Sequence, residues 1–509
     1  MELQNNIVKR IDGWAISNPE HSCFRSGDVS HTYLELKEKS DSLAAYLEKN
    51  HVNKLPVIVY GGLEFEMIVT FLACAKSGHA YIPIDSHTPA DRVGLITEVA
   101  NFTAIIAWED WPLSKRDDEV ELVTSPSLVK ILDRKEAPSE LNYVTADETF
   151  YIIFTSGTTG IPKGVQISHD NLVSYTNWML SDFGLETGQT FLSQAPYSFD
   201  LSVMDVYPAL LSGGQLAPLT KEMINNFKTL FSVLPEMTLN IWVSTPSFVD
   251  ICLMDPRFNG EEMTSLSHFL FCGEELTHGT AMKLRERFPQ AKIFNTYGPT
   301  EATVAVTEIE ITEDVLKNFQ RLPIGRVKSD TAIYIMDEDG QILPEGTVGE
   351  IVIVGPSVSK GYFNNQEKTD EVFYNFEGQQ AYHTGDAGLL KEGVLFYQGR
   401  MDFQVKLHGY RIELEDIDHH LAEVSYVKAA TVVPKYHDHK VQQLVAFIVP
   451  NNHHFDKEYQ LSKAIKEELK MSIMDYMIPQ KYIYVESLPL TQNGKVDRKG
   501  LINEVNPPC

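Results

Sequence analysis

The sequence has few cysteines, and they form no recognisable pattern. There are five, no two of them form a Cys-x-x-Cys pair, and an odd number cannot all pair with one another. A secreted disulfide scaffold is therefore excluded, and a reducing compartment is expected. The histidines near the C-terminus match no recognisable zinc-ligand spacing either. The cysteines are Cys23, Cys74, Cys252, Cys272 and Cys509.

Long hydrophobic runs and an excess of positive charge are also missing. No apolar run approaches the roughly 20 residues that span a bilayer, and the N-terminus lacks the apolar core of a signal peptide. With 43 Lys and Arg against 70 Asp and Glu, the formal net charge is −27, which argues against broad binding of nucleic acid or anionic membranes. We therefore expect a soluble cytoplasmic protein with no nucleic-acid partner and no membrane insertion.

The chain has 509 residues, which is too long for one hydrophobic core, so two or more domains are expected. Apolar strand patterns alternate with helix patterns through the first 330 residues. This alternation predicts an α/β fold with parallel or mixed sheets and helical layers. Expected helices cover residues 3–18, 34–50 and 65–77, expected strands cover 31–33, 56–60, 80–84, 102–107, 149–154, 241–244 and 269–272, and residues 109–140 are expected to be rich in loops.

Beyond residue 330 the pattern changes. Short strands separated by turns predict an antiparallel β subdomain. A charged stretch follows residue 399, and the remaining residues predict a small α+β unit. We therefore expect a large N-terminal domain of residues 1–401 and a small C-terminal domain of residues 402–509. The expected strands are 331–335, 349–354, 394–398, 429–434 and 444–449, and the expected helices are 413–424 and 461–469.

The most informative segment is a glycine-rich loop, residues 154–164, which follows the expected strand 149–154. Its glycines permit tight turns that point backbone N–H groups at an anion, and its hydroxyls and Lys163 add further donors. It is not the usual P-loop, because Pro162 precedes the lysine and Gly164 follows it. A mobile polar surface loop is the alternative, but phosphate binding is favoured. The residues concerned are Thr155, Ser156, Gly157, Thr158, Thr159 and Lys163.

Other polar groups stand at the ends of expected elements. Asp200 could cap the helix that follows it or receive a ligand ammonium, and the local sequence slightly favours the cap. Residues 295–301 offer an aromatic face and a carboxylate after a strand end, where ligands collect in open α/β sheets. Taken alone, however, they favour a Gly-Pro turn capped by Thr300. Asp386 could chelate ribose hydroxyls or sit in an ordinary turn. Lys495 on its own would be a solvated surface lysine.

The order of these motifs is more specific than any one of them. From about His31 to Arg498 the chain resembles the acyl-adenylate-forming superfamily, specifically the adenylation domains that load amino acids onto carrier proteins. Residues 194–204, 242–248, 269–274 and 295–307 further resemble the branch that activates D-alanine for the teichoic acids of Gram-positive cell walls. One departure is His383, where the family usually has Arg. The shared motifs are residues 31–36, 75–85, 154–164, 199–202, 295–301, 349–362, 382–386, 399–415, 476–479 and 490–498.

The resemblance implies an adenylate-forming fold and a nucleotide site. The glycine-rich loop would hold the ATP phosphates, Asp386 the ribose hydroxyls, and Glu301 a Mg²⁺ ion. Tyr297 would stack on adenine. Further nucleotide contacts are implied for Asn295, Thr296, Gly298, Pro299, Thr300, Tyr397, Gln398, Gly399, Arg400 and Lys495.

The resemblance also implies a substrate site and a catalytic lysine. Asp200 would pair with the substrate α-ammonium, which overturns the local preference for a cap, while Cys272 and Val304 would border the amino-acid side chain. Lys495 would be catalytic by reaching both the substrate carboxylate and the phosphate. Since Lys495 lies far in sequence from the glycine-rich loop, the small domain would rotate between half-reactions about a hinge at Asp402.

The implied reaction uses ATP and Mg²⁺, forms D-alanyl-adenylate with release of pyrophosphate, and transfers D-alanine to the phosphopantetheine thiol of a D-alanyl carrier protein. The chain has no carrier-domain Ser motif, so the carrier would come in trans. Two alternatives stay open. One is an adenylation enzyme for another small amino acid, such as L-alanine, glycine or serine. The other is a catalytically silent relative that binds nucleotide or a carrier protein.

Overall fold

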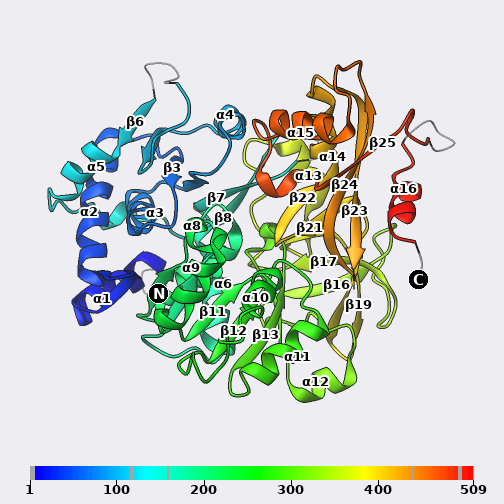
Figure 1. Cartoon of the computed structure of the whole chain (residues 1–509). Helices are drawn as coiled ribbons and strands as arrows, with labels where there is room; N and C mark the ends of the chain where they lie inside the picture. Colours follow the sequence, from blue (N-terminus) through cyan, green and yellow to red (C-terminus); the bar gives the residue numbers. More distant parts are fainter. Residues whose placement is uncertain (1–5, 115–119, 158–159, 438, 491–495, 508–509) are drawn as a thin grey trace. The chain divides into compact units, whose positions relative to one another are not determined.

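The computed structural model describes residues 6–114, 120–157, 160–437, 439–490 and 496–507 (Figure 1). Its residues group into two compact units. The first comprises Met1–Ser86, Ala100–Ile153 and Gly164–Gly399, and the second comprises His87–Val99, Phe154–Lys163 and Arg400–Cys509. The described residues of the glycine-rich loop up to Lys163 are therefore grouped with the C-terminal residues, whereas Gly164 belongs to the first unit. The division into domains 1–401 and 402–509 stays a prediction.

One sheet of the first unit is built from apolar strands that precede and follow α3 (Phe65–Ser77) in the sequence. Its central strand β3 pairs in parallel with β4 and β5, as β-α-β alternation predicts. The helix α3 has the predicted bounds and ends at Gly78, whose φ of +83° suits glycine. The strands in order are β6 (Glu121–Thr124), β5 (Ala104–Ala107), β3 (Val57–Gly61), β4 (Tyr81–Asp85), β7 (Thr149–Thr155) and β8 (Lys163–Ser168).

A second, larger sheet positions Cys272 and residues 295–301 of the predicted site. Its strands β11, β12 and β13 pair in parallel, so their carboxyl ends meet at one edge. Ligands of open α/β sheets bind at such an edge. The strands in order are β15 (Arg326–Val327), β14 (Thr307–Glu310), β13 (Lys292–Tyr297), β12 (His268–Phe271), β11 (Ile241–Ser244), β9 (Thr190–Ser193), β10 (Gln215–Pro218), β1 (Ser22–Ser26) and β2 (Val29–Thr32).

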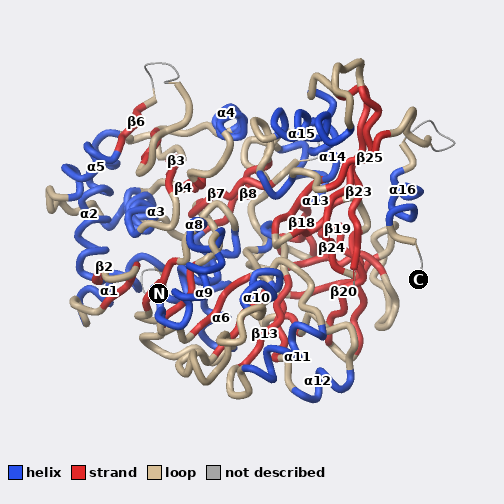
Figure 2. Tube along the Cα trace, in the orientation of Figure 1, coloured by secondary structure: helices blue, strands red, loops and turns tan. Residues whose placement is uncertain are grey.

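Helices accompany these sheets throughout the chain, as Figure 2 shows by colour. The helices other than α3 are α1 (Ile7–Ser17), α2 (Tyr33–Asn50), α4 (Ala90–Val99), α5 (Ser125–Leu132), α6 (His169–Asp182), α7 (Val203–Leu211), α8 (Lys221–Asn225), α9 (Phe227–Val233), α10 (Pro246–Cys252), α11 (His278–Arg287), α12 (Glu313–Asn318), α13 (Gln366–Val372), α14 (Leu414–Glu423), α15 (Glu458–Leu469) and α16 (Arg498–Val505). Within the described ranges, no helix is both long and apolar enough to cross a membrane.

The predicted change of pattern after residue 330 is confirmed. An antiparallel sheet follows, in which β17 pairs with β16 and β19. The second unit then has an α+β arrangement, in which α14 and α15 bury Ile417, Leu421 and Ile465 in one core with the strands. The strands are β16 (Ala332–Met336), β17 (Gly349–Val354), β18 (Phe373–Phe376), β19 (Gln379–Lys391), β20 (Val394–Arg400), β21 (Gln404–Leu407), β22 (Tyr410–Glu413), β23 (Val427–His437), β24 (Lys440–Pro450) and β25 (Lys481–Tyr484).

The expectation of loops over residues 109–140 is wrong in part. Strand β6 pairs in parallel with β5, and α5 follows it directly. Pro126 stands at the start of α5, where a missing N–H costs nothing, and Leu128, Ile131 and Leu132 form its buried stripe. Strand β1 was not expected either, and it pairs with β2 and β10.

Candidate active site

Two residues predicted to hold the nucleotide contact one another where β13 of the larger sheet ends. The Tyr297 hydroxyl, at the end of β13, donates a hydrogen bond of 2.6 Å to Oδ2 of Asp386 in β19. Burial, together with the Asp386 carboxylate, raises the pKa of Tyr297 well above its usual range, so the phenol stays protonated and keeps donating. The ring of Tyr397 lies 6.2 Å from that of Tyr297, centre to centre. The structure therefore brings three predicted nucleotide residues together.

The residues on either side of Tyr297 hold the end of β13 in place. The Asn295 side-chain amide donates to the carbonyl of Pro323 at 2.8 Å, and the Thr296 hydroxyl donates to the carbonyl of Phe271 at 2.8 Å. A Cβ on Gly298 would lie 2.5 Å from Cα of Ala305, so only glycine fits there. Pro299 and Thr300 follow directly, and Tyr397, Gln398, Gly399 and Arg400 complete β20.

His383, the departure from the family pattern, lies beside this group. Its Nδ1 is 2.9 Å from Oε2 of Glu350, and its ring stacks on Tyr374 at 4.9 Å. Oε1 of the same Glu350 accepts a hydrogen bond of 2.9 Å from the backbone N–H of Gly385. Glu350 thus holds both His383 and the backbone that precedes Asp386, which keeps the Asp386 carboxylate in position.

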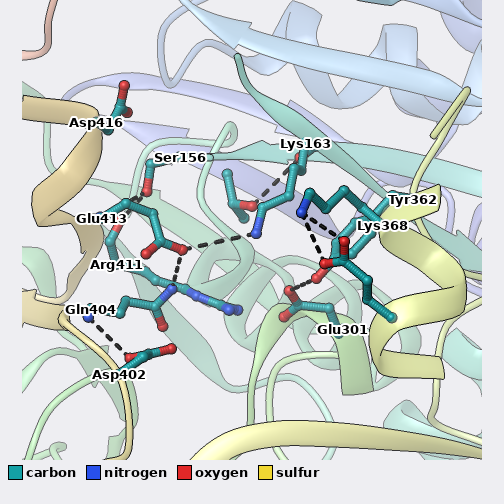
Figure 3. A network of polar contacts seen from close by, with 12 residues as sticks. Ser156, Lys163, Glu301, Tyr362, Lys368, Asp402, Gln404, Arg411, Glu413 and Asp416 are labelled. Atoms are coloured by element: carbon teal, nitrogen blue, oxygen red, sulfur yellow. Dashed lines mark hydrogen bonds and ion pairs between the residues drawn. The ribbon is translucent and has the colours of Figure 1, made fainter. Parts of the chain in front are cut away.

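Glu301, the predicted metal ligand, is fully buried in a short 3₁₀ turn, Thr300–Ala302. Its Oε1 accepts a hydrogen bond of 2.8 Å from the Tyr362 hydroxyl (Figure 3). The next two residues have positive φ, +56° for Thr303 and +69° for Val304. Such angles are strained for β-branched residues, and strain of this kind concentrates at functional sites.

The two residues predicted to border the substrate side chain are in contact. Cys272 directly follows β12, and its Sγ donates to the carbonyl oxygen of Val304 at 3.5 Å. Both residues are buried. The strained turn at Val304 therefore serves to bring this residue against the thiol of Cys272.

Asp200 lies in a 3₁₀ turn, Asp200–Ser202, that precedes α7. The N-cap of this turn is Phe199 and that of α7 is Ser202, so Asp200 is at neither cap position. Burial, followed by the nearby Asp200 carboxylate, raises the pKa of Tyr151 well above its usual range. Burial likewise raises the pKa of Tyr175, with smaller contributions from Cys272 and Asp200. Sequence reasoning missed both tyrosines, which the strand and helix patterns present as ordinary core residues.

In the second unit, Ser156 and Lys163 of the glycine-rich loop contact the C-terminal residues, as Figure 3 shows. The Ser156 hydroxyl donates to the backbone carbonyl of Arg411 at 3.0 Å, and it accepts from the backbone N–H of Glu413 at 3.3 Å. Nζ of Lys163 lies 3.8 Å from Oε1 of Glu413. A Cβ on Gly157 would lie 2.1 Å from the carbonyl oxygen of Ile161, so the turn requires glycine. Thr158 and Thr159 lie outside the described residues.

Asp402, the predicted hinge residue, accepts hydrogen bonds from residues on either side of it in the sequence. Nε of Arg400 donates to Oδ1 of Asp402 at 2.9 Å, and the backbone N–H of Gln404 donates to the same oxygen at 3.0 Å. Burial alone would raise the pKa of Asp402. The hydrogen bonds from Arg400 and the backbone N–H of Gln404, together with the charges of Arg400 and Arg411, outweigh burial, so the pKa lies below its usual value. The carboxylate is therefore ionised and holds the guanidinium of Arg400. Lys495 lies outside the described residues.

Comparisons with known proteins cover both the N-terminal and the C-terminal parts of the chain. The model of the family described as AMP-binding enzyme matches residues 11–363, and that of the AMP-binding enzyme C-terminal domain matches residues 416–495. The chain is 54% identical over 506 residues to the D-alanine–D-alanyl carrier protein ligase of Lactiplantibacillus plantarum, with 99% of each chain covered. It is 50% identical over 509 residues to the ligase of the same name from Listeria monocytogenes, covering 99% of this chain and 100% of the other.

Solved structures show the same fold. The Vibrio cholerae adenylation domain AlmE, in complex with glycyl-adenosine-5'-phosphate, matches with a TM-score of 0.79 and 24% identity, over 98% of this chain and 97% of the other. The o-succinylbenzoate CoA synthetase of Bacillus subtilis matches with a TM-score of 0.82 and 20% identity, over 97% of each chain. The predicted adenylate-forming fold is thus confirmed. The chain belongs to the AMP-binding enzyme family of AMP-forming ligases, in the branch of the D-alanine–D-alanyl carrier protein ligases.

Proposed function

We propose that this protein activates D-alanine with ATP to form D-alanyl-adenylate, and then transfers D-alanine to the phosphopantetheine thiol of a D-alanyl carrier protein supplied in trans. This is the first step in attaching D-alanine to teichoic or lipoteichoic acids. The observation that carries the proposal is the identity of 50–54%, over nearly the full length, with enzymes that bear this name. A cytoplasmic location follows from that role, since ATP is supplied there.

The nucleotide chemistry follows from the residues that meet at the sheet edge. Asp386 offers a buried carboxylate for ribose hydroxyls, and Tyr297 and Tyr397 offer aromatic surface for adenine. Ser156 and Lys163 of the glycine-rich loop would bind the phosphates. The amino-acid carboxylate attacks the α-phosphorus, pyrophosphate leaves, and charge spreads over the reacting oxygens. Catalysis therefore consists mainly of positioning and of stabilisation by cations, with Lys495 as the proposed catalytic residue.

Glu301 suits a Mg²⁺ ion that is shared with the substrate. Magnesium is usually held by one or two carboxylates together with substrate phosphates. Glu301 is fully buried and accepts a hydrogen bond from Tyr362, so its carboxylate is oriented before any ion arrives. The ion would supply charge stabilisation to the phosphates.

The amino-acid end of the site would be formed by Asp200, Cys272 and Val304. Asp200 is a buried carboxylate, a group that suits the α-ammonium of the substrate. The thiol of Cys272, held against Val304, would leave room for a methyl group and limit larger side chains. The alternative substrates L-alanine, glycine and serine also have small side chains, so preference among them is the property to measure.

We expect amino-acid-dependent exchange of pyrophosphate into ATP with D-alanine, and much less with L-alanine, glycine or serine. Reactions without an amino acid provide the background. A preference for one of the other amino acids would retain the adenylation chemistry and reject the D-alanine assignment. The absence of exchange with all four would favour the silent nucleotide-binding or carrier-binding relative.

Replacing Cys272 with alanine should relax the choice between the enantiomers of alanine. The change removes one sulfur atom beside Val304, and one small group in an apolar site is worth about 1–3 kcal/mol of discrimination. We expect the ratio of kcat/KM for D-alanine to that for L-alanine to fall by about tenfold, mainly because L-alanine improves. Cys252→Ala is the matched control, since Cys252 is also buried but lies in α10. An unchanged ratio in Cys272→Ala would remove Cys272 from the specificity site.

A further inference from the structure

We propose that Glu413 acts as a positioning residue that replaces the ATP phosphates at the glycine-rich loop when nucleotide leaves. The proposal rests on the proposed function, because it takes Ser156 and Lys163 as phosphate-binding groups. Glu413 would make no contact with the reacting atoms. Its carboxylate would hold Lys163, and its backbone would hold Ser156, during the part of the cycle in which ATP is not bound.

The contacts of the loop support this exchange. Ser156 both donates to the carbonyl of Arg411 at 3.0 Å and accepts from the N–H of Glu413 at 3.3 Å. The Glu413 carboxylate lies 3.8 Å from the ammonium of Lys163. One short segment, residues 411–413, therefore reaches the hydroxyl and the cation that the loop would offer to phosphate oxygens. Figure 3 shows the Glu413 carboxylate directed toward Lys163.

Glu413 is set up to present a carboxylate at this place. It is the last residue of β22 and the N-cap residue of α14, yet its side chain makes no capping hydrogen bond. The carboxylate instead accepts a hydrogen bond from Gln404 and faces Lys163. The residue is 6% exposed. Burial raises the pKa of Glu413 above its usual value, and Arg411 and then Lys163 act against this shift. Both cations therefore stabilise the carboxylate as an anion, and Lys163 is the one that belongs to the loop.

Further contacts hold Thr155 and Gly160 of the loop. The guanidinium of Arg92, from α4, donates to the carbonyl of Thr155 at 3.4 Å and lies 3.9 Å from Oδ2 of the fully buried Asp416. A Cβ on Gly160 would lie 2.7 Å from the ring of His419, so the loop backbone packs closely against α14. These contacts belong to the same compact unit as Glu413. Among the described residues of the loop, Thr155, Ser156, Gly160 and Lys163 are thus each in contact with other parts of this unit.

ATP and Glu413 are both anions that need the same lysine, so their contacts with Lys163 exclude one another. The Glu413-bound arrangement competes with ATP, and a competing arrangement weakens the apparent affinity of a ligand. Once pyrophosphate has left, the same contacts would hold the loop away from a second ATP while the thiol attacks the adenylate. Glu413 is therefore expected to oppose ATP binding and to favour transfer.

The test is Glu413→Gln, which keeps the size and the hydrogen bond to Gln404 but removes the charge. We expect the Kd for ATP, measured by calorimetry without amino acid, to decrease about three- to tenfold, the range for one partly buried ion pair. We expect single-turnover transfer of D-alanine from preformed adenylate to the carrier thiol to slow by a similar factor. A merely structural defect would weaken both processes, so opposite signs identify the exchange.

The matched control is Glu415→Gln, which removes the same charge two positions further on. Glu415 is half exposed and lies 3.8 Å from Arg498. We expect this variant to match the unaltered enzyme in both measurements. If Glu413→Gln melts at a much lower temperature than the unaltered enzyme, Glu413→Asp takes its place as the test variant. Its shorter side chain keeps the charge but draws it away from Lys163, so the Kd for ATP should again decrease and transfer should again slow.

An unchanged or increased Kd for ATP in a folded Glu413 variant would overturn the inference, as would unchanged transfer. These results would leave the proposed function standing if the unaltered enzyme supports D-alanine-dependent exchange. Failure of that exchange in the unaltered enzyme would instead reject the proposed function itself. The unaltered enzyme thus tests the proposed function, and the Glu413 variants test the role of Glu413.

Discussion

Replacing Lys495 with alanine is expected to lower D-alanine-dependent ATP–pyrophosphate exchange by about 10²- to 10³-fold, the cost of removing one electrostatic donor to a transition state. The lysine is proposed to bridge the substrate carboxylate and the α-phosphate, where negative charge develops as pyrophosphate leaves. Transfer from preformed D-alanyl-adenylate to the carrier thiol should be largely spared, because that step no longer involves pyrophosphate.

Lys499→Ala is a suitable control, since Lys499 is an exposed lysine four positions further on. We expect it to retain both half-reactions. Retained exchange in Lys495→Ala would contradict the catalytic role of this lysine. Equal loss of exchange and transfer would point instead to a general defect of the C-terminal residues.

Replacing Asp402 with proline is expected to impair thioester formation several-fold more than adenylation. Proline fixes φ near −65° and removes the backbone N–H, so it restricts the backbone rotation that we expect at this position between the two half-reactions. The two rates are measured separately, as pyrophosphate exchange and as single-turnover transfer to the carrier.

The substitution also removes the carboxylate that holds Arg400 and the N–H of Gln404. Asp402→Asn separates these effects, because it weakens the ion pair but leaves the backbone free. We expect this variant to retain most of the transfer rate. A proline variant that loses both half-reactions to the same extent would reject the hinge.

The elements that the sequence predicts well are those with strong local signals. The helix α3 is mostly apolar and ends at Gly78, and β11 and β17 are short apolar runs bounded by turn residues. Local patterns are weak where polar residues dominate, so the sequence predicts a loop where β6 and α5 form. The buried stripe Leu128, Ile131 and Leu132 with a proline at the helix start was the signal that could have revealed α5.

The site was predictable as a set of residues but not as a set of contacts. The order of the family motifs singles out Tyr297, Asp386, Cys272 and Val304, and the structure adds that they meet as two pairs. The pairing of the glycine-rich loop with Glu413 could not be inferred, because Ser156 and Glu413 are 257 positions apart and neither lies in a pattern that refers to the other. Such contacts depend on tertiary packing, which no local pattern encodes.

The central claim is tested most directly by the unaltered enzyme, by comparing D-alanine with L-alanine in ATP–pyrophosphate exchange and then adding a phosphopantetheinylated D-alanyl carrier protein. The account predicts strong exchange with D-alanine and loading of the carrier with D-alanine, detected by the mass of the intact carrier. Exchange that prefers L-alanine, glycine or serine, or D-alanine exchange that never loads the carrier, would contradict it.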